Sequence, residues 1–379
     1  MTMRPLLVAL LILTAAMAAA NGSNDDAKGV ATLAGAGVTR YRIAIAWGVV
    51  TTLTGSLLSL TFAAKISTVF TNGIVAVPPD PAFAVAVLAG AVFWVGLATL
   101  TRFPVSTTHA IVGSMIGAGL FLAPLSIRWV SMATRVAIPL LVSIAVSFVL
   151  SALLGRVTRA APQCVCVDVD VPAQAGAVGQ ADRSGLTAAA AVEPPRSSPP
   201  IVYVVTSTSP RCRVHGPVTR RIGLNVNTAH WLTSGAASFA RGLNDTPKIW
   251  AIGAFGLVPG TFHPRQLLVL IAFAMAAGGA VAAVRVGRRL GENVVRMNHR
   301  EGFTANLTTA FLVGLGANLG LPMSTTHVST GAIAGVAGRQ VQRLDTATLR
   351  DFVMAWTVTP AVAGLVAFAA LAATRAMIR

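Results

Sequence analysis

The fold of this chain follows from one charged stretch, Asn21-Gly22-Ser23-Asn24-Asp25-Asp26-Ala27-Lys28. The stretch lies between an apolar run over residues 6–20 and a second apolar, glycine-rich run over residues 29–38. Its charges therefore interrupt what would otherwise be one helix of membrane length. Ionisable residues are costly within a membrane, so their presence here indicates a functional site.

The chain carries this stretch twice, together with a second motif. The charged stretch returns 220 positions later as Gly242-Leu243-Asn244-Asp245-Thr246-Pro247-Lys248. The second motif is Phe103-Pro104-Val105-Ser106-Thr107-Thr108-His109, and it returns 218 positions later as Leu321-Pro322-Met323-Ser324-Thr325-Thr326-His327. Two motifs repeated in the same order indicate the internal duplication of a whole membrane unit.

The composition excludes a soluble protein. Charged residues make up 11% of the 379 residues and hydrophobic residues 54%, whereas soluble domains carry roughly 25% charged residues. The formal charge of +17 would suggest nucleic acid in a soluble chain. Here no basic stretch carries interleaved aromatics, and arginines are expected to gather in cytoplasmic loops. We therefore predict a multi-pass protein of the inner (cytoplasmic) membrane, with the lipid bilayer and not nucleic acid as its partner.

Residues 1–20 also have the features of a cleavable signal peptide, because Arg4 precedes an apolar core that ends in small residues. Cleavage near Ala20 would remove the leading half of the helix that carries the first charged stretch. We therefore expect these residues to belong to the first membrane span.

Composition divides the chain into three parts. We expect an N-terminal membrane repeat over residues 1–154, a hydrophilic central linker over 155–224 and a C-terminal membrane repeat over 225–379. In the linker, arginine, proline, serine and Ala/Gly-rich runs replace the apolar pattern.

The linker contains all three cysteines, Cys164, Cys166 and Cys212, with His215 three residues after the last. Their spacing matches no standard zinc pattern. We therefore favour reduced linker thiols over a metal site and predict no metal centre. The role of the linker is left open.

Each copy of the second motif carries three consecutive hydroxyl residues after a proline. A short glycine-rich apolar run follows, which suits a broken or re-entrant helix packed inside protein. Unpaired N–H groups at a helix N-terminus, together with clustered hydroxyls, are typical of a site for a tetrahedral oxyanion. The alternative is that the hydroxyls only cap helices or bond to neighbours, but the duplication favours a ligand. The predicted substrate-binding residues are Ser106, Thr107, Thr108, Ser324, Thr325 and Thr326.

The carboxylates of the first motif would repel an anion. Each costs roughly 2.5–3.5 kcal/mol inside a membrane, so Asp25, Asp26 and Asp245 are tolerable only with accompanying cations or protons, as in a coupled symporter, and we favour coupling for Asp25 and Asp245. Lys28 and Lys248 lie three residues after these aspartates on the same helix face, so a structural ion pair is an equal alternative for the lysines. Interrupted helices at corresponding positions of two repeats indicate a secondary transporter with its site near the membrane midplane.

These motifs resemble those of the PiT family of inorganic phosphate transporters, which carries a duplicated Gly-Ala-Asn-Asp-x-Ala-Asn motif and a duplicated Pro-x-Ser-Thr-Thr-His motif. All four occur here in the family's order and cover both halves. The resemblance implies an all-α polytopic membrane protein, an inverted-repeat transporter of about ten to twelve transmembrane segments. It also implies that the hydroxyl motifs bind phosphate and that coupling cations are held by Asn24, Asp25, Asn244 and Asp245.

The chain departs from the family at three positions. Lys28 and Lys248 replace the final Asn of the first motif, and Arg241 replaces a residue that is commonly His. In sodium-coupled relatives this Asn helps to build a cation site, so a lysine ammonium can take the place of sodium. We expect a phosphate symporter that is proton-coupled or sodium-independent. Its coupling ion would be H⁺ or Na⁺, it would need no cofactor, and both lysines would belong to the coupling site.

Two other functions are weighed against this one. A sulfate permease, or one for another tetrahedral oxyanion, would share the fold, but acceptor groups near the site favour phosphate, which carries protons. A membrane lipid-pyrophosphate phosphatase would need a nucleophile–base pair with further acid or metal groups. Outside the linker and the aspartate motifs no acid lies beside a hydroxyl motif, so we predict a transporter and not an enzyme. The sequence leaves open whether phosphate travels as a metal–phosphate complex and whether the protein is a homodimer.

Overall fold

The computed structural model describes residues 3–76, 78, 80–170, 201–207, 220–257, 263–338 and 340–378. They form two compact units. The first, the helical unit, combines Met1–Ala160 with His230–Arg379, and the second, the strand unit, is Ala161–Ala229. The helical unit therefore brings together the two ends of the chain.

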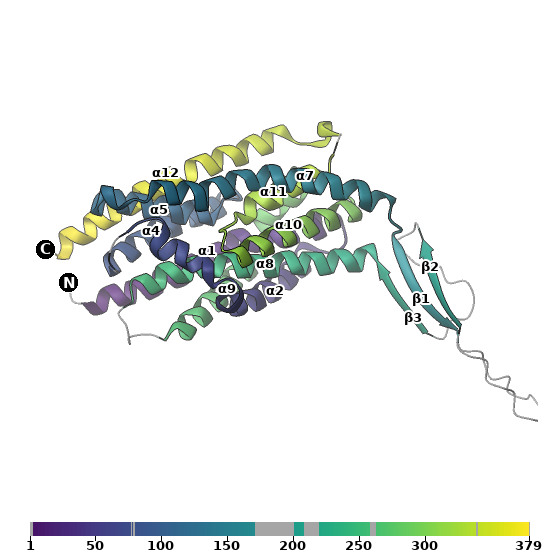
Figure 1. The fold of residues 1–379 in the computed structure, drawn as a ribbon, viewed down its shortest axis with the longest axis horizontal. Coiled ribbons are helices and arrows are strands. Elements are labelled where there is room, and N and C mark those ends of the chain that lie inside the picture. Colours follow the sequence, from purple (N-terminus) through teal and green to yellow (C-terminus); the bar gives the residue numbers. More distant parts are fainter. Residues whose placement is uncertain are drawn as a thin grey trace, which may run out of the picture. The chain divides into compact units, whose positions relative to one another are not determined.

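Long helices that run alongside one another build the helical unit (Figure 1). In chain order they are α1 (Met3–Gly35), α2 (Tyr41–Phe62), α4 (Pro81–Leu100), α5 (Thr107–Leu122), α7 (Ile138–Ala160), α8 (Val226–Phe255), α9 (Pro264–Asn293), α10 (His299–Leu319), α11 (Thr325–Gly335) and α12 (Thr346–Ile378). Shorter helical segments lie between them: α3 (Ala64–Thr68), η1 (Val69–Gly73), η2 (Pro124–Ser126), α6 (Trp129–Met132), η3 (Ala133–Ala137) and η4 (Val341–Arg343).

Six helices of the described residues are long and apolar enough to cross a membrane. Their bounds are Arg4–Gly35, Tyr41–Phe62, Pro81–Leu100, Trp129–Ala160, Pro264–Asn293 and Thr346–Met377. α8 and α10 have a similar length but contain no comparably long apolar window, and α5 and α11 are shorter. The prediction of an all-α, multi-pass membrane fold is confirmed for the helical unit.

The two Asn-Asp motifs lie in the middle of unbroken helices, α1 and α8. We had predicted from the sequence that their charges interrupt these helices, and this prediction is wrong. An α-helix satisfies its own backbone hydrogen bonds, so no break is needed where the charged side chains find partners. Even Pro247 lies inside α8 without ending it.

Breaks do occur before the hydroxyl motifs, as predicted. α5 begins at Thr107 and α11 at Thr325, and Ser106 and Ser324 are their N-caps. Each serine hydroxyl accepts a hydrogen bond from the backbone N–H three residues on, at 3.3 Å in α5 and 3.2 Å in α11. These helices of 16 and 11 residues are shorter than the roughly 20 residues that cross a bilayer.

The motif glycines bring α1 and α8 against neighbouring backbones. α1 packs mainly on α9, and a Cβ at Gly22 would lie 1.9 Å from the carbonyl oxygen of Met275 in that helix. A Cβ at Gly242 of α8 would lie 2.4 Å from the carbonyl oxygen of Thr52 in α2. The first motif therefore needs glycine for packing, in addition to its charged residues.

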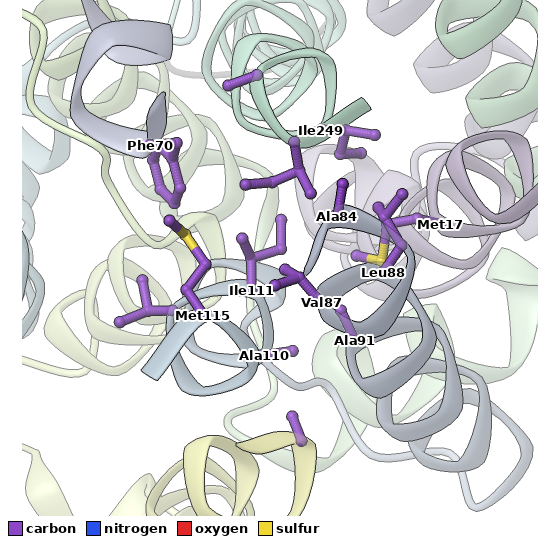
Figure 2. Packing of buried hydrophobic residues seen from close by; sticks show 14 of the residues in the cluster. Met17, Phe70, Ala84, Val87, Leu88, Ala91, Ala110, Ile111, Met115 and Ile249 are labelled. Atoms are coloured by element: carbon purple, nitrogen blue, oxygen red, sulfur yellow. The ribbon is translucent and has the colours of Figure 1, made fainter. Parts of the chain in front are cut away.

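An apolar cluster around α4 sets the position of the first hydroxyl motif. Figure 2 shows side chains of α1, α4, α5 and α8 that meet there, among them Met17, Leu88, Ile111 and Ile249. Each of these four is at most 1% exposed. Helices within a membrane associate through such van der Waals packing. The cluster therefore fixes α4 and α5, and with them the connection over residues 101–106.

The strand unit holds a three-stranded antiparallel sheet in the order β2-β1-β3. The strands are β1 (Cys164–Asp170), β2 (Ile201–Ser207) and β3 (Arg220–Asn225). We had expected a linker here and no strands. The signal was present, because the valines of β1 alternate with other residues at the period of a strand. α7 also continues to Ala160, past the expected start of the linker at residue 155.

Two of the three cysteines lie in the described part of the chain. Cys164 and Cys166 are on β1, with their Sγ atoms 3.4 Å apart, and neither is a free thiol, so the prediction of reduced thiols is wrong for these two residues. Cys212 and His215 lie outside the described residues. Among the residues that the structure describes, no group of three or more His, Cys, Asp or Glu side chains could hold a metal ion.

Candidate substrate and coupling site

The N-terminal ends of α5 and α11 meet inside the helical unit. The Ser324 hydroxyl donates to the Ser106 hydroxyl at 3.0 Å, and the ring centroids of His109 and His327 lie 4.7 Å apart. The predicted substrate-binding residues thus come together from the two halves of the sequence. All six are at most 4% exposed: Ser106, Thr107, Thr108, Ser324, Thr325 and Thr326.

Asn24 and Asn244 hold the segments that lead into these helices. Asn24 accepts from the N–H of Val105 at 3.1 Å and donates to the carbonyl of Phe103 at 2.9 Å. Asn244 accepts from the N–H of Met323 at 3.1 Å and donates to the carbonyl of the same residue at 2.9 Å. Each asparagine therefore ties a charged helix to the hydroxyl motif of its own half.

The ammonium of Lys28 contacts three oxygens of different kinds. It forms a salt bridge with Asp25, and it donates to the Val105 carbonyl at 2.7 Å and to the Thr326 hydroxyl at 2.5 Å. An ammonium has three donors, so these partners saturate it. Asp25 and Val105 belong to the first half of the chain, whereas Thr326 belongs to the second.

Lys248 repeats this arrangement from the other side. Its ammonium lies 3.0 Å from an Asp245 carboxylate oxygen, and it donates to the Met323 carbonyl at 2.8 Å and to the Thr108 hydroxyl at 2.7 Å. Each lysine therefore pairs with the aspartate of its own motif and reaches the hydroxyl motif of the other half. Each lysine thus forms the ion pair considered in the sequence analysis, and it also contacts a threonine that was predicted to bind substrate.

The three oxygens around each lysine ammonium are a carboxylate, a backbone carbonyl and a threonine hydroxyl, and we call them its oxygen cage. Carboxylate, backbone carbonyl and other neutral oxygens are the ligands of hard cations in proteins. Both lysines are 1% exposed.

Three residues that we had not assigned to the site complete it: Asn21, Asp26 and Arg241. Arg241 forms a salt bridge with Asp26 and donates to the Asn21 side-chain oxygen at 2.9 Å. The Asn21 amide nitrogen lies 3.2 Å from a carboxylate oxygen of Asp25 and 3.3 Å from one of Asp245. Asn21 thus bridges the aspartates of the two halves. Two features of the sequence could have indicated these residues: Asp26 is a second acid directly after Asp25, and Arg241 is an arginine within an apolar run.

The buried charges balance one another. Three carboxylates and three cations are each at most 2% exposed: Asp25, Asp26, Asp245, Lys28, Lys248 and Arg241. Buried charges are costly unless they are paired, and each of these contacts an opposite charge. Oδ2 of Asp26 is the one carboxylate oxygen of the cluster without a hydrogen-bond partner in the described residues.

This arrangement defines a class of protein. Two short helices whose N-termini meet at a buried polar cluster, inside a bundle of membrane-spanning helices, are typical of secondary transporters. The N-termini favour an anion between them.

The chain belongs to the phosphate transporter family, which matches residues 21–367. The resemblance inferred from the motifs is thereby confirmed. The family consists of transporters, so the phosphatase alternative is set aside.

Similar proteins cover nearly all of the chain. A provisionally named phosphate permease of Pyrococcus abyssi is 29% identical over 97% of this chain and 97% of its own length. A provisionally named low-affinity inorganic phosphate transporter of Mycobacterium bovis is 26% identical over 97% of this chain and 77% of its own. A solved structure, described as the sodium-dependent phosphate transporter, matches with a TM-score of 0.68 at 22% identity. It covers 98% of this chain and 99% of the other. This likeness shows the fold.

Proposed function

We propose that this chain is a symporter that carries inorganic phosphate across the cytoplasmic membrane, driven by protons and independent of sodium. One observation carries the proposal. Two oxygen cages beside the hydroxyl motifs are each filled by an ammonium of the chain, that of Lys28 in one and that of Lys248 in the other.

Phosphate would bind where α5 and α11 meet. Each N-terminus presents N–H groups without partners inside the helix and a partial positive charge. The hydroxyl motifs add donors from both halves, so a tetrahedral anion can bond to both helices at once. Thr108 and Thr326 already touch the two ammonium groups. The lysines would therefore also face the anion, and charge-assisted bonds to it would be short and strong.

A sodium ion would find little attraction here. The three carboxylates are already paired with lysine and arginine, and a fixed ammonium cannot travel with the substrate. A proton can still be taken up and released. The unpartnered oxygen of Asp26 is the acceptor that the site offers, and a proton bound there would offset part of the negative charge of the phosphate.

The contacts between the two halves suit alternating access. We propose that the repeats over 1–154 and 225–379 form an inverted pair that moves around the fixed site. The bonds from Lys28 to Thr326 and from Lys248 to Thr108 cross between the halves. They would hold the site closed, and phosphate that takes over the threonine hydroxyls would weaken them.

The test is the uptake of labelled phosphate into proteoliposomes. We expect uptake to follow an imposed proton gradient, to be the same in sodium and potassium media, and to resist an excess of sulfate. A strict need for sodium would contradict the coupling proposal. Competition by sulfate would change the substrate and leave the site in place.

The role of Asp26 has its own test in the paired variant Asp26→Asn/Arg241→Gln, which removes one charge of each sign. We expect this variant to exchange phosphate between the two faces and to lose its response to a proton gradient. An intact response would exclude Asp26 as the proton carrier.

A further inference from the structure

Four arginines line a second cavity, which lies outside the central site. Its volume is about 460 Å³, and its lining is Arg102, Val284, Arg285, Arg288, Arg289 and Asn293. We call it the arginine pocket. Arg102 follows the end of α4, and the other residues belong to the last turns of α9.

The arginine pocket has an excess of positive charge. Its lining contains no acidic residue. Asp351 of α12 pairs with Arg289 at 2.9 Å, but Arg102, Arg285 and Arg288 form no salt bridge with any residue that the structure describes. Guanidinium groups with free donors match the oxygens of a phosphate group in a bidentate way.

The pocket adjoins the backbone that leads to the central site. The guanidinium of Arg289 lies 4.1 Å from the centroid of the Phe103 ring. The carbonyl of Phe103 accepts from Asn24, and the carbonyl of Val105, two residues on, accepts from Lys28. One short segment therefore separates the arginine pocket from the first oxygen cage.

Arg102 occupies a conformation that an arginine avoids. Its φ is +64°, and it is the one non-glycine residue with a positive φ in the described chain. The equivalent position of the second half is Gly320, with φ +74°. Left-handed backbone closes the end of α4 here as it closes the end of α10, with the N–H of Phe103 bonded to the Ala98 carbonyl at 2.8 Å, and glycine is the residue that suits this conformation best.

At the matching place of the second half, a lysine lies against the backbone. A Cβ at Gly320 would lie 2.7 Å from the Cβ of Lys65, so the stem of that lysine fills the space. Arg102 comes from the first half of the chain, and the other lining residues come from α9 in the second half.

A simpler interpretation is that arginines gather at the membrane edge and extend into water. That accounts for exposed arginines on α9. It does not account for the stacking of Arg289 on Phe103.

We propose that the arginine pocket is an outer phosphate subsite, which binds the anion on one face of the membrane and passes it to the central site along the Phe103–Val105 segment. The inference rests on the proposed phosphate transport. A phospholipid headgroup has the same oxyanion chemistry, and the experiment separates the two sources.

The experiment measures uptake of labelled inorganic phosphate in right-side-out and inside-out vesicles, at low and high ionic strength. The variant Arg285→Gln/Arg288→Gln is expected to raise KM about tenfold at low ionic strength on the face that carries the pocket, because the field of the pocket raises the local anion concentration. High salt should remove most of this difference. KM on the other face should not change.

Two matched variants accompany it. Arg265→Gln removes one arginine charge at the other end of α9 and is expected to leave KM unchanged. Arg285→Lys/Arg288→Lys keeps the charge and should restore most of the affinity.

Arg102→Gly separates a functional role from a structural one. Glycine relieves the positive φ, so the variant should unfold at a higher temperature than the wild type while its KM rises. A variant that is less stable, with an unchanged KM, would contradict the role of Arg102.

The remaining outcomes decide between the sources. If the variant Arg285→Gln/Arg288→Gln transports phosphate with the KM of the wild type on both faces, the subsite is overturned and the proposed function stands. An effect seen in vesicles that contain phosphatidylglycerol, and absent in phosphatidylcholine alone, would assign the pocket to lipid and overturn the subsite too. Wild-type protein that moves no phosphate would contradict the proposed function, and the subsite with it.

Discussion

The first and second halves of the site hold their lysines alike but surround them differently. Lys28 and Lys248 each contact an aspartate, a backbone carbonyl and a threonine of the other half. Outside these cages three positions break the symmetry. Asn21 stands where the second half has Arg241, Asp26 stands where it has Thr246, and Arg102 stands where it has Gly320.

The difference separates two tasks. A site that opens to either face in turn needs contacts that both halves can make, and the lysine cages supply them. A driving ion needs a group that changes its charge, and one such group is enough. The unpartnered carboxylate oxygen of Asp26 has no counterpart at Thr246, so under the proposed function the symmetric cages would serve closure and Asp26 would serve coupling.

The largest effects are expected from the aspartates of the cages. Asp25→Asn leaves the Lys28 ammonium buried without a counter-charge, which should cost about 3–5 kcal/mol of folding stability and abolish uptake. Asp245→Asn should lower stability and uptake to a similar extent, because Lys248 has partners of the same kinds. Thermal unfolding and phosphate uptake measure both effects.

The double variant Asp25→Asn/Lys28→Gln serves as the control for that prediction. It should recover much of the stability without recovering uptake. If one single aspartate variant keeps near wild-type uptake while the other loses it, the symmetry of the cages is not functional.

Intermediate effects are expected from two glycines within α5 and α11, the helices that begin at the hydroxyl motifs. A Cβ at Gly117 of α5 would lie 2.0 Å from the Gly364 carbonyl oxygen, and one at Gly335 of α11 would lie 2.3 Å from that of Phe148. Either glycine-to-alanine change should cost about 1–3 kcal/mol, because it overpacks a close helix contact. Denaturation in detergent measures the loss.

Gly96 provides the matched control, because a Cβ there would meet no atom within 4 Å. Gly96→Ala should be neutral or stabilise α4 by up to about 1 kcal/mol. Equal losses at Gly96 and Gly117 would refute the packing argument.

The smallest effects are expected from the paired serines. Ser106→Ala and Ser324→Ala each remove a helix N-cap and should cost about 1 kcal/mol, with a raised KM for phosphate. The two hydroxyls share one hydrogen bond of 3.0 Å, so the double variant should lose less than the sum of the single losses. Strictly additive losses in unfolding and KM would show that the two helix ends act independently.

Local signals predicted the parts of the site that lie along the chain. In each motif a serine two residues after a proline marks the start of a helix, and α5 and α11 begin directly after Ser106 and Ser324. Residues three apart share a helix face, and Lys28 does contact Asp25.

Contacts between the two halves of the chain could not be predicted from such local signals. Lys28 reaches Thr326 across 298 positions, and Arg241 reaches Asp26 across 215. No periodic pattern encodes such pairs. The wrong prediction of broken motif helices has the same cause, because distant partners neutralise the charges that suggested a break in α1.

The central claim is that Lys28 and Lys248 take the place of sodium. The most direct measurement is phosphate uptake in sodium and in potassium media by the wild type and by Lys28→Asn/Lys248→Asn, which restores the asparagines typical of the family. We predict that wild-type uptake is equal in both media, and that the variant transports only with sodium and is stabilised by it, because a bound ion favours the folded state. A wild type that requires sodium, or a variant that remains indifferent to it, would contradict the account.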